Sequence, residues 1–189
     1  VNAVKPVVML DPGHGGGDIG ARIKFPHVEE KRFALQIALL TRQYLEQLGY
    51  RVLMTRARDV FVPLKRRVYV ANKANAEVFV SLHFNSCPNR LAHGIEIYYS
   101  NFGKNTKKIV ASKKLADTIL SRMVFRTQAY SRGVREGSFC VIRDTHMPAV
   151  LVEGGFVTNG QELSQLKQRQ YLEKLAKGIA EGIDRFVRS

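Results

Sequence analysis

Three short apolar runs, each followed by turn residues, constrain the fold of this 189-residue chain more than any other feature. They span residues 7–10, 77–82 and 148–152 and are rich in valine. Continuous apolar runs of this length are typical of strands that are buried on both faces, as in a parallel sheet. The sequence therefore predicts an α/β fold with a mostly parallel central sheet of about six strands, flanked by helices on both faces.

Helix-like and strand-like segments alternate along the rest of the chain. The first helix opens at Glu29 and Glu30, which complement the helix dipole, and closes at Gly49. No internal repeat, low-complexity run or linker interrupts the alternation, and we expect one domain over residues 1–189. Further helices are expected at 64–74, 107–123 and 161–187, the last broken near Arg169, and further strands at 50–55, 94–99, 139–143 and 149–156.

The chain is strongly basic, with 30 Lys and Arg against 16 Asp and Glu and a formal net charge of +14. Such a field attracts polyanions, whether nucleic acid, anionic lipid or an acidic envelope polymer. No nucleic-acid-binding module and no tryptophan accompanies the charge, so specific nucleic-acid binding is not expected. No apolar stretch approaches the roughly 20 residues that span a bilayer. The chain also lacks a signal sequence, and we interpret it as a mature or trimmed form.

Each of the three apolar runs leads into a residue with acid-base or metal-binding chemistry. His14 follows the first run, His83 the second and Glu153 the third. Ligands of open parallel sheets gather at the carboxyl ends of the strands, so we expect these side chains to converge. A catalytic zinc takes three protein ligands and leaves one position for water. His14 and His83 are natural donors, Glu30 can supply the third ligand, and Glu153 suits a general base.

Several other residues offer weaker alternatives. His27 could replace Glu30 as a ligand, and Cys87, four residues after His83, could also bind zinc. Cys140 lies in an apolar run and is expected to be buried, and whether the two cysteines pair stays open. Ser164-Gln165-Leu166-Lys167 matches the S-x-x-K motif of penicillin-binding serine enzymes, but the confirming S-D-N and K-T-G motifs are missing.

A set of motifs along nearly the whole chain resembles the zinc-dependent N-acetylmuramoyl-L-alanine amidases of the amidase 3 type. These motifs occur in order and without large gaps. They are Leu10–Gly16, Glu30-Lys31, Thr55-Arg56, Arg67 with Ala71-Asn72, Ser81–Ser86, Gly94–Tyr99 and Pro148–Asn159.

The resemblance implies a role for each matching residue. It gives His14, Glu30 and His83 as the ligands of one zinc ion per chain and Glu153 as the catalytic glutamate. Glu30 is favoured over Glu29 because the ligand glutamate of the family directly precedes a lysine, as Glu30 precedes Lys31. The implied reaction is hydrolysis of the amide between N-acetylmuramic acid and L-alanine of peptidoglycan, in a periplasmic or secreted enzyme that acts in cell division or wall remodelling.

Two departures from the family pattern modify this expectation. Division-associated members carry a long insertion with a helix that plugs the site until an activator removes it. Residues 101–132 of this chain are too short for that insertion, so we expect an open enzyme whose activity does not require release of a plug. We separately expect a monomer, and an activator protein stays an open alternative. The segment Phe25-Pro26-His27 is the second departure from the family pattern, and it leaves the contacts on the substrate side unassigned. The rival hypotheses are a zinc peptidase, a bifunctional amidase and penicillin-binding carboxypeptidase using Ser164, and a non-catalytic polyanion-binding wall protein.

Overall fold

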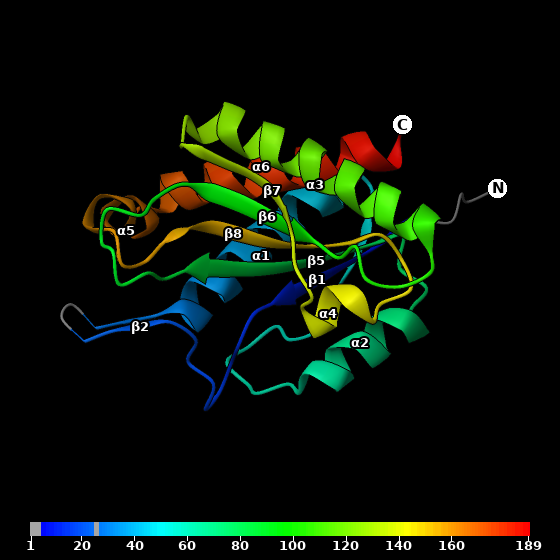
Figure 1. Cartoon of the computed structure of the whole chain (residues 1–189), viewed down its shortest axis with the longest axis horizontal. Coiled ribbons are helices and arrows are strands. Elements are labelled where there is room, and N and C mark those ends of the chain that lie inside the picture. The colour runs from blue at the N-terminus through cyan, green and yellow to red at the C-terminus, as the bar shows by residue number, and fades with distance from the viewer. Residues whose placement is uncertain (1–4, 25–26) are drawn as a thin grey trace.

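A six-stranded sheet in the order β4-β1-β5-β8-β6-β7 runs through the centre of the molecule (Figure 1). The structure is a computed structural model that describes residues 5–24 and 27–189. All neighbouring strands of this sheet are parallel except β6 and β8, so the predicted fold class is confirmed. The strands are β1 (Val7–Pro12), β4 (Arg51–Met54), β5 (Val78–Asn85), β6 (Ile95–Tyr99), β7 (Ser131–Glu136) and β8 (Ala149–Phe156), and a separate antiparallel pair is formed by β2 (Arg22–Ile23) and β3 (Val28–Glu29).

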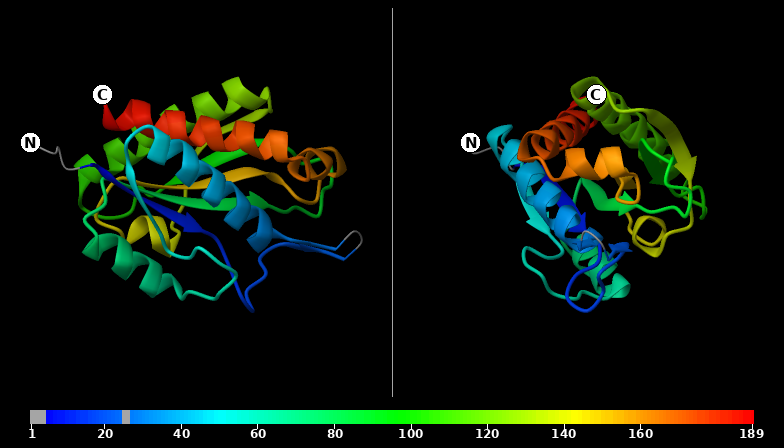
Figure 2. Two further views of the ribbon diagram at one scale, coloured as in Figure 1. Left: turned by 180° about the vertical axis from the view of Figure 1, so that it is seen from behind. Right: turned by 90° about the vertical axis from the view of Figure 1, so that its left-hand side faces the viewer.

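Helices cover the two faces of the sheet unequally (Figure 2). Three long helices lie on one face: α1 (Glu30–Gln47), α3 (Thr106–Thr127) and α6 (Arg169–Val187). The opposite face is covered by α2 (Leu64–Lys73) and α4 (Cys140–Arg143), which are much shorter. Helix α5 (Gly160–Leu166) follows β8, and the gap before α6 confirms the break expected near Arg169. None of the helices in the described parts of the chain is long and apolar enough to cross a membrane.

The alternation of side chains along β5 determines on which face of the sheet Ser81 and His83 lie. Val80 and Leu82 pack into the large core beneath the three long helices. Phe79 packs into the smaller core beneath α2 and α4. Successive side chains of a strand point to opposite faces, so Ser81 and His83 follow Phe79 onto the face that the short helices leave partly open. On this face Ser81 is buried and His83 is partly buried at the end of β5.

The structure contradicts one expected strand and adds one unpredicted strand to the central sheet, besides the short pair β2 and β3, which the sequence did not predict either. Residues 139–143 were expected to form a strand, but the α4 helix forms there, and Cys140 is only half-buried at its first position rather than buried. Lys108 donates to the carbonyls of Ile142, Arg143 and Thr145 at the end of α4, which favours a helical turn in this short run. The added strand is β7, a polar edge strand whose sequence SRGVRE lacks apolar alternation.

Helices α3 and α6 pack so closely that glycine is required at their crossing. A Cβ added at Gly182 would lie 2.4 Å from the Ile119 Cα, and one at Gly178 would lie 2.6 Å from the Met123 Cα. Both neighbours are backbone atoms of α3, which cannot move aside as a flexible side chain can. The two glycines therefore set the distance between the helices that support the face of the sheet opposite the open one.

We expect Gly182→Ala to lower the free energy of unfolding. The added methyl group overpacks the helix crossing at a cost of about 1–3 kcal/mol, even though alanine favours a helix by about 1 kcal/mol over glycine. Urea denaturation measures the change. Gly160→Ala is the matched control because a Cβ there meets nothing within 4 Å. Equal effects of the two substitutions would show that close packing is not the reason for Gly182.

An ion pair between the same helices predicts a pH dependence of stability. Burial opposes ionisation of Glu181, but hydrogen bonds from Arg126 and Arg122 outweigh it and lower its pKa below the usual 4.5. A carboxylate whose pKa is lowered in the folded state stabilises the protein above its unfolded pKa and loses that contribution as the pH falls. Glu181→Gln should cost up to about 1 kcal/mol at pH 7 because the pair is partly exposed, and the difference from the unmodified protein should shrink below about pH 4.5. A constant difference in denaturation curves between pH 7 and pH 3 would contradict this.

Candidate metal centre

The loop after β1 holds His14 against the ends of β5 and α1, and two glycines allow the close approach. A Cβ at Gly13 would lie 2.2 Å from the His83 ring, and one at Gly20 would lie 2.5 Å from a carboxylate oxygen of Glu30. Gly13 N also donates to Leu82 O at 2.9 Å, which ties the loop to β5. The glycines of this segment therefore leave the space that the functional side chains occupy.

His14, Glu30 and His83 meet at one point, although they come from a loop, a helix and a strand. Glu30 Oε1 lies 3.1 Å from His14 Nε2 and 2.9 Å from His83 Nδ1. One ligand atom from each residue lies within 4.8 Å of the others. The neighbouring Glu29 lies apart from this cluster and contacts Lys31 and Arg32 instead.

Hydrogen bonds on the far side of both imidazoles orient them toward the cluster. Asp18 lies 2.9 Å from His14 Nδ1, and Ser81 Oγ lies 3.1 Å from His83 Nε2. Ser81 donates its own proton to Asp11 Oδ2 at 2.7 Å, so it accepts from the ring N–H of His83. His83 Nδ1 faces Glu30 at 2.9 Å, and a cation bound there would replace the Nδ1 proton and meet the ring lone pair. Two imidazoles and a carboxylate with such outer partners fit the donor set of a divalent transition metal.

Two buried arginines fix the loop that carries His14. Arg56 Nε and Nη2 donate to Pro12 O and Gly13 O at 3.0 and 2.6 Å. Arg67 donates to Pro12 O at 2.7 Å, to His14 O at 2.8 Å and to Asp11 Oδ1 at 2.9 Å. These bonds hold His14 at a φ of 60°, a left-handed conformation that costs a non-glycine residue about 1–2 kcal/mol. Strain of this kind is retained where the surrounding contacts over-determine the backbone.

The charges of the cluster reinforce one another. Burial opposes ionisation of Glu30, but its hydrogen bonds with His14 and His83 prevail and hold its pKa well below the usual value. Burial likewise opposes protonation of His14, yet Glu30 and Asp18 raise the pKa of its ring above 6.5. Glu30 is therefore present as the carboxylate at neutral pH, which is the form that a cation binds.

Glu153 lies beside this cluster with an unusual environment. It is paired directly with His83 across β5 and β8, and residues opposite each other on neighbouring strands project to the same face. Its Oε2 atom is buried and lacks a hydrogen-bond partner among the residues that the structure describes. Burial first, and then the charges of Glu30 and Glu96, raise its pKa well above 4.5. A strongly perturbed carboxyl group next to a metal-type cluster is a candidate acid-base group.

Other residues that the sequence singled out lie outside the cluster. His27 bonds Glu29 at 3.2 Å, and its neighbours Phe25 and Pro26 fall outside the described residues. Cys87 and Cys140 are both free thiols, and neither joins the cluster. Ser164 and Lys167 are exposed on α5 and just after it, so the S-x-x-K motif lies on a surface helix. The sequence did not single out Asp18 as a partner of His14, although its spacing of four residues was a usable signal.

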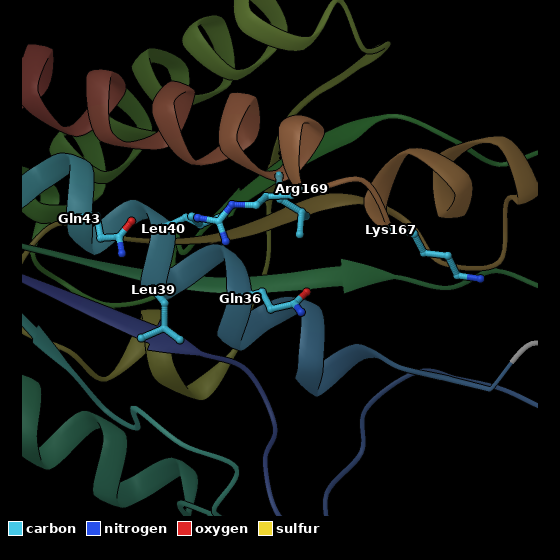
Figure 3. Close-up of a pocket in the computed structure, with 7 residues that line it drawn as sticks. Gln36, Leu39, Leu40, Gln43, Lys167 and Arg169 are labelled. Atoms are coloured by element: carbon cyan, nitrogen blue, oxygen red, sulfur yellow. The ribbon is translucent and has the colours of Figure 1, made fainter.

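A hollow opens beside His14 and His83 of the cluster. Its volume is about 250 Å³, and it is lined by His14, His83, the Arg67 side chain and the apolar residues Phe61 and Val141. A different hollow of about 330 Å³ lies between α1 and the start of α6, where Figure 3 shows Gln36, Gln43 and Arg169 around it. The second hollow contains no carboxylate or imidazole in its lining. The second hollow therefore lacks the imidazole and carboxylate groups that the cluster offers.

Comparison with known sequences agrees with this geometry. The profile of the family described as N-acetylmuramoyl-L-alanine amidase matches residues 8–185. The chain is 32% identical to the amidase AmiC of Neisseria meningitidis serogroup B over 98% of its own length, and 35% identical to the amidase LytC of Bacillus subtilis, again over 98%. It spans only 54% of AmiC and 36% of LytC, about half the length of these relatives or less.

Solved structures give the same result for the fold. The catalytic domain of the amidase CwlV from Bacillus (Paenibacillus) polymyxa var. colistinus superimposes with a TM-score of 0.89 at 38% identity, covering 97% of this chain and 98% of that one. The CwlD amidase of Clostridioides difficile, solved in complex with the GerS lipoprotein, gives a TM-score of 0.90 at 28% identity, covering 97% and 99%. A partner protein is therefore known for one structural relative.

The geometry predicts that the cluster binds a divalent metal. His83→Ala removes a donor and should weaken zinc or cobalt binding by more than about 100-fold, the upper end of the loss caused by removing outer partners alone. His146→Ala is the matched control, because His146 is exposed and outside the cluster. Equilibrium dialysis with metal analysis measures both proteins. Equal metal content in the two variants would rule out His83 as a ligand.

Proposed function

Because this chain belongs to the N-acetylmuramoyl-L-alanine amidase family, we propose that it hydrolyses the amide between N-acetylmuramic acid and L-alanine of the peptidoglycan stem peptide. The single observation that carries the proposal is the convergence of His14, Glu30 and His83 beside the unpartnered Oε2 of Glu153. A family member that had lost catalysis and served only to bind the wall would have no physical need for this combination.

We propose that His14, Glu30 and His83 hold one zinc ion per chain. The reasons are the donor set of two imidazoles and one carboxylate and the outer partners Asp18 and Ser81. When bound, zinc would polarise the substrate carbonyl, lower the pKa of water to about 7 and favour the ionised form of Glu153.

Glu153 is proposed as the general base. Its Oε2 has no partner within the described chain and is therefore free to accept the proton of the attacking water. The same oxygen can then deliver that proton to the leaving nitrogen of L-alanine, so that the amine departs neutral. The pairing of Glu153 with His83 across the strands places both side chains on the same face of the sheet.

The surroundings of the site support an enzyme that is open at rest. Between β6 and β7 the chain forms α3, which packs against α6 beneath the face opposite the cluster. A plugging helix is therefore not contributed by residues 101–130, and we propose activity without release by an activator. We also propose that residues 1–189 form a monomeric catalytic domain acting on peptidoglycan outside the cytoplasm, where its +14 charge favours an anionic envelope.

Glu153→Gln should retain metal but lose hydrolysis. The substitution keeps the shape of the side chain and removes its basicity, so kcat should fall by about 10²- to 10⁴-fold. Mass spectrometry of purified peptidoglycan after incubation with the zinc-loaded protein measures the products. We expect free stem peptides that begin with L-alanine, together with glycan stripped of peptide.

Glu77→Gln is the control for this experiment, since Glu77 is exposed before the start of β5. Shortened peptides still joined to muramic acid would replace the proposal with a zinc peptidase. Full turnover by Glu153→Gln would reject Glu153 as the base. The absence of any soluble product from the unmodified protein would reject amidase activity that needs no activator.

A further inference from the structure

The face of the sheet that carries the cluster continues beyond Glu153 toward the edge strand. His83 on β5 is paired with Glu153 on β8, and Glu153 is paired with Glu96 on β6. Residues that lie directly opposite on neighbouring strands project to the same face. The three side chains therefore form a row across three strands, which leads from the metal cluster toward β7.

Glu96 ends this row as a buried carboxylate with four partners. It accepts hydrogen bonds from Asn85 Nδ2 at 2.7 Å, Tyr98 OH at 3.0 Å and Arg132 Nε at 2.9 Å. Arg135 Nε lies 3.0 Å from the same oxygen that Arg132 contacts. Glu96 thus holds two guanidinium groups of β7 side by side.

An irregularity of β7 brings these two arginines to the same side. Residues three apart on a regular strand project to opposite faces. The register between β6 and β7 shifts between Ile95 and Glu96, where Ser131 faces Ile95 but Gly133 already faces Glu96. Gly133 has a φ of 89°, a conformation that glycine adopts readily at a bulge. The bulge turns Arg132 onto the face of Arg135, and bulges of this kind often re-aim side chains beside active sites.

The arginine pair has binding capacity that the protein itself does not use. Within residues 5–24 and 27–189, Arg132 Nη2 and both terminal nitrogens of Arg135 have no hydrogen-bond acceptor, and the only further bond is from Arg132 Nη1 to His93 O at 3.3 Å. The side chains of Arg132 and Arg135 are 28% and 48% exposed. Two guanidinium charges against one Glu96 carboxylate also leave an excess of positive charge. The Phe156 ring, 4.9 Å from Arg132 Cζ, supports the first of the two groups from one side.

We propose that Arg132 and Arg135 form a subsite that binds a carboxylate of the stem peptide, and this inference rests on the proposed amidase function. The guanidinium fork matches a carboxylate in a planar, two-bonded geometry that an ammonium group does not reproduce. β7 lies two strand spacings from β8, about 10 Å, and an extended peptide advances about 3.3–3.6 Å per residue. The bound carboxylate is therefore about three residues from the scissile amide. The N-acetylated sugars have no free carboxylate once the lactyl group is in the amide, so the subsite recognises the peptide.

The test compares two muramyl tripeptides, one with its peptide carboxylates free and one with them converted to carboxamides. The unmodified enzyme should cleave the acid with a kcat/KM about 10- to 100-fold higher than the carboxamide, the range expected for a hydrogen-bonded charge pair. Arg135→Gln should lose this preference by slowing the acid alone, with the carboxamide within about threefold of the unmodified rate. Arg135→Lys should recover only part of the preference because it keeps the charge and loses the fork.

Arg169→Gln is the matched control, since it removes the same charge at an exposed position on α6. If it lowers acid cleavage as much as Arg135→Gln, or if Arg135→Gln slows both compounds equally, the subsite is rejected. Calorimetric binding of both compounds to Glu153→Gln, with and without Arg135→Gln, makes the test independent of turnover. Failure of the unmodified protein to cleave either compound would reject the amidase function. Tighter binding of the acid than of the carboxamide that depends on Arg135 would still support the subsite. Equal binding of the two compounds would overturn the subsite.

Discussion

Satisfaction of buried carbonyl groups by two arginines is the interaction on which the rest of the site depends. The turn after β1 must leave the sheet at once to bring His14 over β5, so its carbonyl oxygens cannot join a strand ladder. The guanidinium groups of Arg56 and Arg67 donate to these carbonyl oxygens instead. Asp11 balances part of their positive charge. A buried carbonyl without a donor costs about 1–3 kcal/mol, so the turn would otherwise rearrange. The cluster is therefore held in place by the backbone of one loop, and that backbone is held by guanidinium groups.

The buried carboxyl groups on the face of the sheet that carries His83 differ in the groups that neutralise their charge. Those paired with arginine suit a structural role, and the other two suit the proposed chemical roles. Asp11 is matched by Arg67, and Glu96 by two arginines. Glu30 has imidazoles on both sides, and a cation can replace the ring protons that face the carboxylate. Glu153 has carboxylates as its main charged neighbours and keeps an unpartnered oxygen. A buried carboxyl group with an unpartnered oxygen costs folding free energy, and costs of this kind cluster at functional sites.

The sequence predicted the central part of this arrangement because parallel strands place their carboxyl ends at one edge, and His14, His83 and Glu153 each follow an apolar run. It predicted Glu30 only by reach and by resemblance. The edge strand β7 could not be predicted from the sequence in the same way. Its only apolar residue that points into the core is Val134, and its polar sequence resembles that of a loop. The run at 139–143 was wrongly assigned because four apolar residues fit a strand or a helical turn equally well, and Lys108, distant in sequence, decides the outcome. The hydrogen bond between Ser81 and His83 depends on side-chain rotamers, which cannot be read from the hydrophobic periodicity of a sequence.

The bulge at Gly133 has a consequence for how proteins of this architecture diversify. An edge strand pairs with a single neighbour, so gaining or losing one residue in β7 leaves the ladder between β5 and β8 intact. Such a change would nevertheless reverse which side chains of β7 project onto the face of the sheet that carries His83, Glu153 and Glu96. A single codon insertion or deletion in β7 would therefore change the proposed arginine subsite while the paired positions of His83 and Glu153 stay as they are.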